Sequence, residues 1–218
     1  MGLSKTKQNK IIFPLVADFL EPIGYALDKN LPTRLWKITD EHVFQVFFDF
    51  VSSGFSRFTM MLITHREVER IIMEIGMPNF DLDSYVKGEE FLWTVHDKEN
   101  QLAYDANKQG LKTEADAEAF GRAVVEYLDQ SGLTFAEKYS SLPNVLARME
   151  ELEKGGKYWK DILAGGPEYF FRGLIISKLC EDPDYERKLT YADELFLPNT
   201  SEKWKPYYAQ LKAKLKTL

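Results

Sequence analysis

Two short segments decide the fold: VFQVFFDF at residues 43–50 and FSRFTMMLITH at residues 55–65. Apolar residues alternate with other residues in both segments, which is typical of β-strands that bury one face. The intervening Ser52-Ser53-Gly54 supplies the small, flexible residues that form a tight turn. The sequence therefore predicts an antiparallel hairpin over residues 43–65.

The two faces of this hairpin differ in chemistry. One face is wholly apolar and carries Phe44, Val46, Phe48, Phe50, Phe58, Met60 and Leu62. The other face mixes aromatic, polar and charged side chains. Because an isolated hairpin is only marginally stable in water, we expect further strands and a cover of helices on the apolar face.

Helical patterns surround the predicted hairpin. A first helix is expected over residues 4–25, with Ser4 as its N-cap, Pro14 and Pro22 as kinks or breaks, and Gly24 as its end. Residues 35–39 and 91–95 predict a third and a fourth strand. A short amphipathic helix is expected over residues 68–75.

The second half of the chain reads as helical throughout. A capping box formed by Thr113 and Asp116 predicts one helix, which we expect to end at Gly132. Further helices are expected after Ser141, after Pro167 and from about Ser201. The Pro167 helix is apolar almost all round, which is typical of a central, buried helix.

These elements together predict an α+β fold. It comprises an N-terminal helix, an antiparallel β-meander of three to five strands, and a helical C-terminal half packed on one sheet face. We expect a single domain over residues 1–218. A division into a helix-plus-sheet part, 1–110, and a helical part, 111–218, is the alternative.

Charge and cysteine content restrict the classes of partner. Lys and Arg total 28 against 34 Asp and Glu, so the formal charge is −6 and nucleic-acid binding is not expected. The apolar run at residues 11–17 is too short to span a bilayer, so no membrane partner is expected. Cys180 is the only cysteine, which precludes an intrachain disulfide and fits a cytoplasmic protein.

No catalytic or metal-binding motif is present in the sequence. The three histidines do not occur at metal-ligand spacings, and no nucleophile-elbow motif is found. The acidic residues Asp81, Asp83, Glu89 and Glu90 miss the calcium-loop pattern. We therefore expect no cofactor, no metal and no catalytic residues, and we favour a function other than catalysis.

The mixed face of the hairpin is the candidate binding site. Its proposed binding residues are Gln45, Phe47, Asp49, Arg57, Thr59 and His65. Aromatic and arginine anchors surrounded by polar groups are typical of protein-recognition surfaces. The alternative is that this face is half-solvated, or covered by a helix with Asp49 and Arg57 paired beneath it.

The order of elements also resembles known bacterial families. The stretch Leu20-Glu21-Pro22-Ile23-Gly24-Tyr25, then Trp36-Lys37, then a meander and helices, is similar to domains known only as being of unknown function. Some of these are proposed immunity proteins of contact-dependent toxins. The resemblance implies an α+β fold and a protein partner, and it assigns no functional residue.

Three functions follow as hypotheses. The first is a non-catalytic, immunity-like protein-interaction module. The second is an enzyme or small-molecule binder with a site between the sheet and the C-terminal helices, formed by Asp49, Arg57 and His65. The third is a homodimer through the aromatic C-terminal helix, which carries Trp204, Tyr207 and Tyr208.

Overall fold

The computed structural model describes residues 2–28, 33–51, 55–78, 92–98, 100–108 and 110–218. It describes the backbone but not the side chains of residues 49–51, 55–59 and 197. The predicted turn at 52–54 and the acidic residues Asp81, Asp83, Glu89 and Glu90 lie outside the described residues.

The predicted α+β class is confirmed. The sheet is antiparallel where its register is defined and has five strands in sequence order: β1 (Ala26–Leu27), β2 (Arg34–Ile38), β3 (His42–Val51), β4 (Phe55–His65) and β5 (Val95–His96). Leu35 pairs with Val46 and Trp36 pairs with Gln45 across β2 and β3. The fourth strand was predicted over residues 91–95, whereas β5 begins only at Val95.

The helices and helical turns account for most of the remaining chain. They are α1 (Lys5–Leu20), η1 (Glu21–Ile23), α2 (Arg66–Ile75), α4 (Gln101–Asn107), α5 (Glu114–Tyr127), η2 (Leu128–Gly132), α6 (Leu133–Tyr139), α7 (Leu142–Lys154), η3 (Trp159–Asp161), α8 (Glu168–Leu179), α9 (Tyr185–Asn199), η4 (Glu202–Trp204) and α10 (Lys205–Leu215).

Local signals for helix ends are confirmed at several places. The Ser4 hydroxyl accepts a hydrogen bond from the Lys7 N–H, as an N-cap does. Gly24 follows η1 with φ at 92°, a conformation that favours glycine. The Thr113 capping box is complete, because its hydroxyl and the Asp116 side chain each accept a backbone N–H of the other residue.

Gly132 does not end the helix that begins after Thr113, so that prediction was wrong. The chain passes through the π-helical turn η2 and continues directly into α6. A Cβ atom at Gly132 would lie 3.1 Å from a ring carbon of Tyr127. The glycine therefore allows tight packing inside a continuing helix, rather than a left-handed stop.

The chain forms two compact units, each made of two separate segments. Unit 1 comprises residues 1–63 and 96–138, and unit 2 comprises residues 64–95 and 139–218. This division differs from the alternative boundary at residue 110, because α5 packs in the core of unit 1. The boundaries fall at the end of β4 and within β5.

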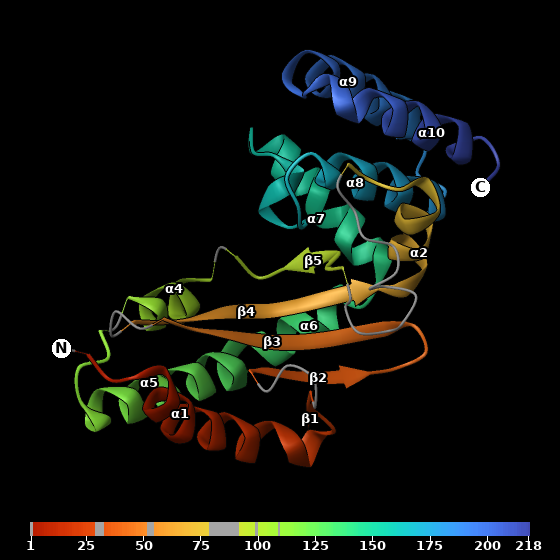
Figure 1. Ribbon diagram of the computed structural model, residues 1–218. Coiled ribbons are helices and arrows are strands. Elements are labelled where there is room, and N and C mark those ends of the chain that lie inside the picture. The colour runs from red at the N-terminus through yellow and green to blue at the C-terminus, as the bar shows by residue number, and fades with distance from the viewer. Residues whose placement is uncertain (1, 29–32, 52–54, 79–91, 99, 109) are drawn as a thin grey trace. The chain divides into compact units, whose positions relative to one another are not determined.

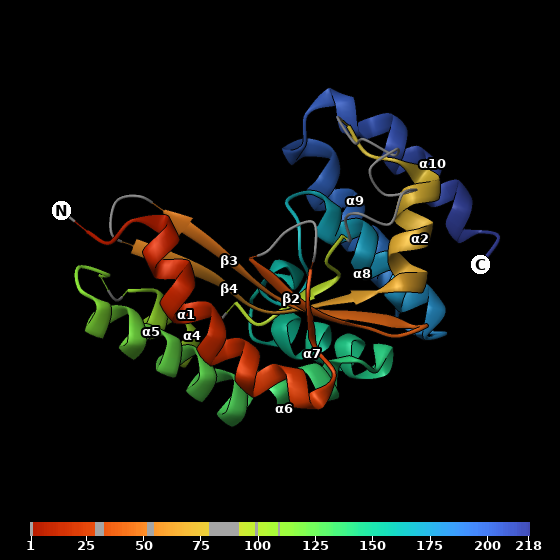
Figure 2. The ribbon, with the colours of Figure 1, turned by 60° about the horizontal axis from the view of Figure 1, so that its bottom comes forward.

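In unit 1, α1 and α5 lie side by side and contribute to the same core as β2, β3 and β4 (Figures 1 and 2). Val46 and Phe48 of the predicted apolar face are buried in this core, and Phe44 and Met60 pack against it. This confirms the helical cover for these residues. The side chains of Phe50 and Phe58 are outside the described residues.

Unit 2 is built around α8, which contacts α2, α7, α9 and α10. Eight consecutive residues of α8, 170–177, are buried, as the sequence predicts for a central helix. Phe171 and Phe196 meet Trp204 and Tyr208 in one aromatic cluster. Trp204 and Tyr208 are therefore buried within unit 2, whereas Tyr207 is half-buried, and the homodimer through this helix stays a prediction.

Candidate functional site

The predicted recognition face of the hairpin is only partly exposed. Gln45 and His65 are buried, so their prediction as surface residues was wrong. The reason is that consecutive residues are buried at 45–46 of β3 and at 61–65 of β4. Because successive strand residues point to opposite faces, both faces are covered at these positions. Phe47 is half-buried. The side chains of Asp49, Arg57 and Thr59 lie outside the described residues, so their role stays a prediction.

His65 is held in place within unit 2. Its ring Nε2 lies 2.8 Å from the carbonyl oxygen of Tyr139, and its backbone N–H donates to Thr94 Oγ1 at 2.9 Å. Because a carbonyl oxygen only accepts hydrogen bonds, Nε2 carries the proton in this contact. These contacts anchor the end of β4. The hypothetical site that combines His65 with Asp49 and Arg57 is not tested by the described side chains.

A buried ion pair lies next to His65. Glu69 of α2 receives Arg172 of α8 in a two-pronged contact, with Nε–Oε1 at 2.7 Å and Nη2–Oε2 at 2.8 Å. Thr94 Oγ1 donates to Glu69 at 2.7 Å, and Arg172 Nη1 donates to the carbonyl of Ala164 at 2.8 Å. Every charged atom of this cluster thus has a partner, which indicates a structural role.

A second buried cluster surrounds Lys188 of α9. Its ammonium group donates to Asp182 at 2.6 Å and to Glu150 at 3.2 Å. Burial by itself would raise the pKa of Asp182. Hydrogen bonds from Lys188, Ser177 and the Asp184 N–H outweigh burial and hold that pKa below its usual range. This carboxylate therefore stays ionised at neutral pH and ties the start of α9 to the end of α8.

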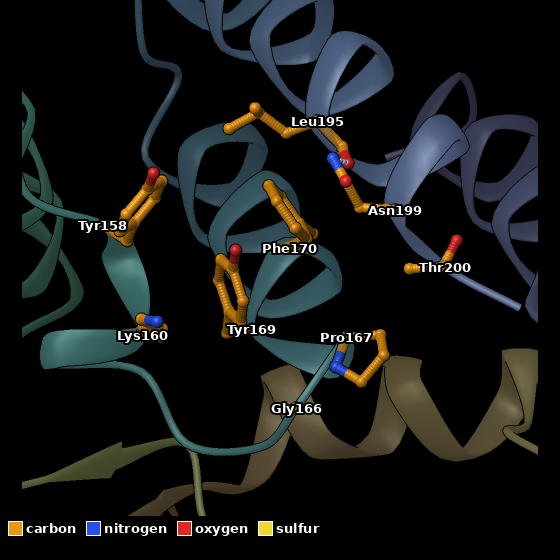
Figure 3. A pocket seen from close by; sticks show the side chains of 9 residues that line it. All are labelled: Tyr158, Lys160, Gly166, Pro167, Tyr169, Phe170, Leu195, Asn199 and Thr200. Atoms are coloured by element: carbon orange, nitrogen blue, oxygen red, sulfur yellow. Dashed lines mark hydrogen bonds between the residues drawn. The ribbon is translucent and has the colours of Figure 1, made fainter.

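A pocket of about 380 Å³ in unit 2 is the strongest candidate for a binding site (Figure 3). We call it the aromatic pocket. Its lining residues are Tyr158, Lys160, Gly166, Pro167, Tyr169, Phe170, Leu195, Asn199 and Thr200. They come from η3 and the segment before it, from the start of α8, and from the end of α9.

Local sequence explains how these elements meet at the pocket. Gly165 has φ at 95°, which favours glycine, and Pro167 then fixes the backbone at the start of α8. On the opposite side, Pro198 lies in the last turn of α9. Asn199 Nδ2 donates to the Leu195 carbonyl, and the Thr200 hydroxyl donates to the Phe196 carbonyl, both at 2.7 Å.

Aromatic rings provide the apolar wall. Tyr169 and Phe170 stack with ring centroids 4.2 Å apart, and Phe170 packs inward against Phe196 at 5.7 Å. Tyr158 is 46% exposed and contributes a ring at the mouth of the pocket. The wall is therefore packed against other rings on its inner side and accessible to solvent on its outer side.

Hydrogen-bond donors lie beside these rings. The hydroxyls of Tyr158 and Tyr169 point in the same direction (Figure 3) and have no hydrogen-bond partner among the described residues. Burial raises the pKa of Tyr169, so its hydroxyl stays protonated at neutral pH. The Lys160 ammonium lies 5.1 Å from the centroid of the Tyr158 ring.

The chemistry of this lining suits binding. Among the lining residues that the structure describes there is no carboxylate, imidazole or thiol, the groups that most often act as bases or nucleophiles. The pocket could not be predicted from the sequence, because Gly165-Gly166-Pro167 signals only a helix start. The adjacent run Lys157-Tyr158-Trp159-Lys160, which mixes rings and lysines, was the available signal.

Comparisons with known proteins do not assign the chain to a family. No family model matches it, and neither the curated proteins nor the solved structures contain a significant match. The resemblance to bacterial domains of unknown function therefore stays a prediction. No helix in the described ranges is long and apolar enough to cross a membrane. The described residues also contain no group of three side chains that could hold a metal ion.

Proposed function

We propose that this chain is a non-catalytic protein-interaction module whose aromatic pocket receives an apolar side chain of a partner protein. The observation that carries this proposal is the cluster of Tyr158, Tyr169 and Phe170 around a solvent-accessible pocket. Aromatic residues in pockets are typical centres of binding energy in protein interfaces.

The size of the pocket supports a side chain as its occupant. Its volume of about 380 Å³ is at the lower end of the range for ligand sites. The exposed Tyr158 ring leaves one side open, whereas sites for small molecules usually bury most of the ligand. One ring or branched aliphatic group, with the rest of the partner lying outside, fits these two features.

The proposal includes two expectations from the sequence. A cytoplasmic location agrees with the single cysteine. An immunity-like role would follow from the resemblance to bacterial families. In that role the pocket would be one anchor point of a larger interface.

A peptide-display selection tests the proposal. A random peptide library is selected on the full chain and, in parallel, on Tyr169→Ala. We expect peptides specific to the unsubstituted chain to share an aromatic or large aliphatic residue. Replacing that residue by alanine in a synthetic peptide should weaken binding by about tenfold or more, as for an interface hot spot.

Tyr104→Ala is the matched control, because Tyr104 is 56% exposed on α4 of unit 1 and does not line the pocket. This variant should bind the selected peptides as the unsubstituted chain does. Peptides that bind the Tyr169→Ala variant equally well would overturn the proposal.

A further inference from the structure

We propose that the aromatic pocket selects an anchor in which an acidic group lies next to the apolar ring. This inference rests on the proposed function and specifies the chemistry of the inserted group. The inference rests on two features that occur together in the pocket. The rings of Tyr158, Tyr169 and Phe170 form an apolar wall, and the two tyrosine hydroxyls and the Lys160 ammonium are hydrogen-bond donors in the same lining.

Several hydrogen-bond donors of the pocket lining are unused. The two tyrosine hydroxyls and the Lys160 ammonium have no hydrogen-bond or ion-pair partner among the described residues. On the opposite side, the amide nitrogen of Asn199 and the hydroxyl of Thr200 already donate to α9 carbonyls. A ligand rich in acceptor oxygens would satisfy the unused donors.

Lys160 favours a charged acceptor over a neutral one. Its nitrogen is held over the Tyr158 ring, 5.1 Å from the centroid, on the edge of the pocket. A carboxylate that reaches this ammonium forms a charge-assisted hydrogen bond, which is roughly twice as strong as a neutral one. The contact with the ring also limits how far the flexible lysine must be reordered when a ligand binds.

The acidic residues near the pocket do not neutralise Lys160 by direct contact. Asp161 is its chain neighbour, and the structure records no ion pair between them among the described residues. Glu168 Oε2 lies 3.0 Å from the Cβ position of Gly165, and Arg172 Nη1 lies 2.7 Å from the same position. Glu168 does not line the pocket, and its Oε2 atom is buried with no hydrogen-bond partner among the described residues.

A pair of probes isolates the acidic group. N-acetyl-L-phenylalanine and N-acetyl-L-phenylalanine amide carry the same ring, but only the first carries a carboxylate. Each is titrated into the full chain and followed by amide chemical shifts in two-dimensional NMR. We expect shifts centred on residues 158–170 and 195–200, and a Kd about 3- to 10-fold lower for the acid at low salt.

Substitutions show whether Lys160 binds the carboxylate of the probe. In Lys160→Gln, the acid and the amide should bind with equal Kd, while the amide binds as it does to the unsubstituted chain. Tyr158→Phe removes one donor, keeps the ring, and should reduce the preference. Lys98→Gln, an equal charge change at an exposed residue of unit 1, should preserve it.

The outcomes separate the two proposals. Equal affinity of the unsubstituted chain for acid and amide, with shifts at the pocket, overturns the acidic anchor and leaves the proposed function intact. A preference that survives in Lys160→Gln also overturns the acidic anchor. Shifts that lie elsewhere for both probes, or that never saturate, overturn the proposed function as well.

Discussion

Single buried polar residues in both units strongly affect the free energy of unfolding, and the Glu69–Arg172 pair is the clearest case. Both side chains are only 3% exposed, and they join α2 to α8 through two parallel hydrogen bonds. Removing one partner of such a pair leaves an uncompensated buried charge. The pair therefore matters more for stability than the exposed ion pairs on the surface.

We expect Arg172→Met to lower the free energy of unfolding by about 3–5 kcal/mol, the usual cost of leaving one buried ion unpaired. Urea denaturation measures this change. Arg70→Met is the control, since Arg70 pairs with Glu74 on the exposed side of α2 and should cost less than about 1 kcal/mol. Equal effects of the two substitutions would contradict the structural role of Arg172.

Gln45 presents the opposite case, because its polar side chain is buried without a partner among the described residues. The side chain is completely buried, and in the part of the chain that the structure describes neither its amide nitrogen nor its amide oxygen has a hydrogen-bond partner. We expect Gln45→Met to raise the free energy of unfolding by about 1–2 kcal/mol, because it removes an unpaid desolvation cost. Gln130→Met, at an exposed position of unit 1, should change stability little. A destabilised Gln45→Met would contradict this account.

At the scale of elements, one side chain of α5 fastens this helix to the sheet. The Tyr127 hydroxyl accepts the Met61 N–H of β4 and donates to Asp97 after β5, both at 2.9 Å. Burial raises the pKa of Asp97, and hydrogen bonds from Tyr127 and Asn100 oppose this shift only in part. The folded state therefore holds the Asp97 proton more tightly than the unfolded state does.

This shift predicts a pH dependence of stability. Because the folded state binds more protons, stability should fall as pH rises from the ordinary Asp pKa of about 4 through the raised value. Asp97→Asn should remove this contribution, since asparagine does not titrate. The measurement is the difference in unfolding free energy between the two proteins from pH 3 to 8. A difference that is constant, or that grows in favour of the unsubstituted chain as pH rises, would refute the assignment.

The elements that could be predicted from sequence are those with strong local signals. Examples are the alternation from Phe44 to Phe48, the Thr113 capping box and the almost wholly apolar surface of α8. Each of these patterns is formed by residues that lie close together in the sequence. The helices α4 and α9 were missed, because α4 is short and α9 carries a mixed surface with Pro198 inside it. The binding face was also misjudged, since alternation separates two faces but does not say which neighbours cover them.

At the scale of the whole molecule, the chain leaves unit 1 after residue 63 and returns to it at residue 96. The core of unit 1 therefore depends on segments far apart in sequence. Phe120, Val124 and Tyr127 of α5 pack in the same core as the N-terminal helix. No local signal near residue 110 reveals this dependence. For this reason the sequence allowed a division into residues 1–110 and 111–218.

We expect a fragment of residues 1–110 to lack a cooperative unfolding transition, because it loses the α5 side chains that complete the core. Circular dichroism during thermal denaturation, together with the dispersion of amide shifts in NMR, measures this. The full chain, prepared in the same way, provides the reference. A well-dispersed spectrum and a sharp transition for the fragment would show that the first 110 residues fold independently.

The central claim is that the aromatic pocket is where the chain binds its partner. Isotope-filtered NOE spectroscopy of the full chain with N-acetyl-L-phenylalanine tests it by reporting which protein protons lie close to the probe. The account predicts NOEs from the phenyl protons of the probe to the side chains of Tyr158, Tyr169 and Leu195. Saturable binding with NOEs only to residues outside the pocket would contradict it.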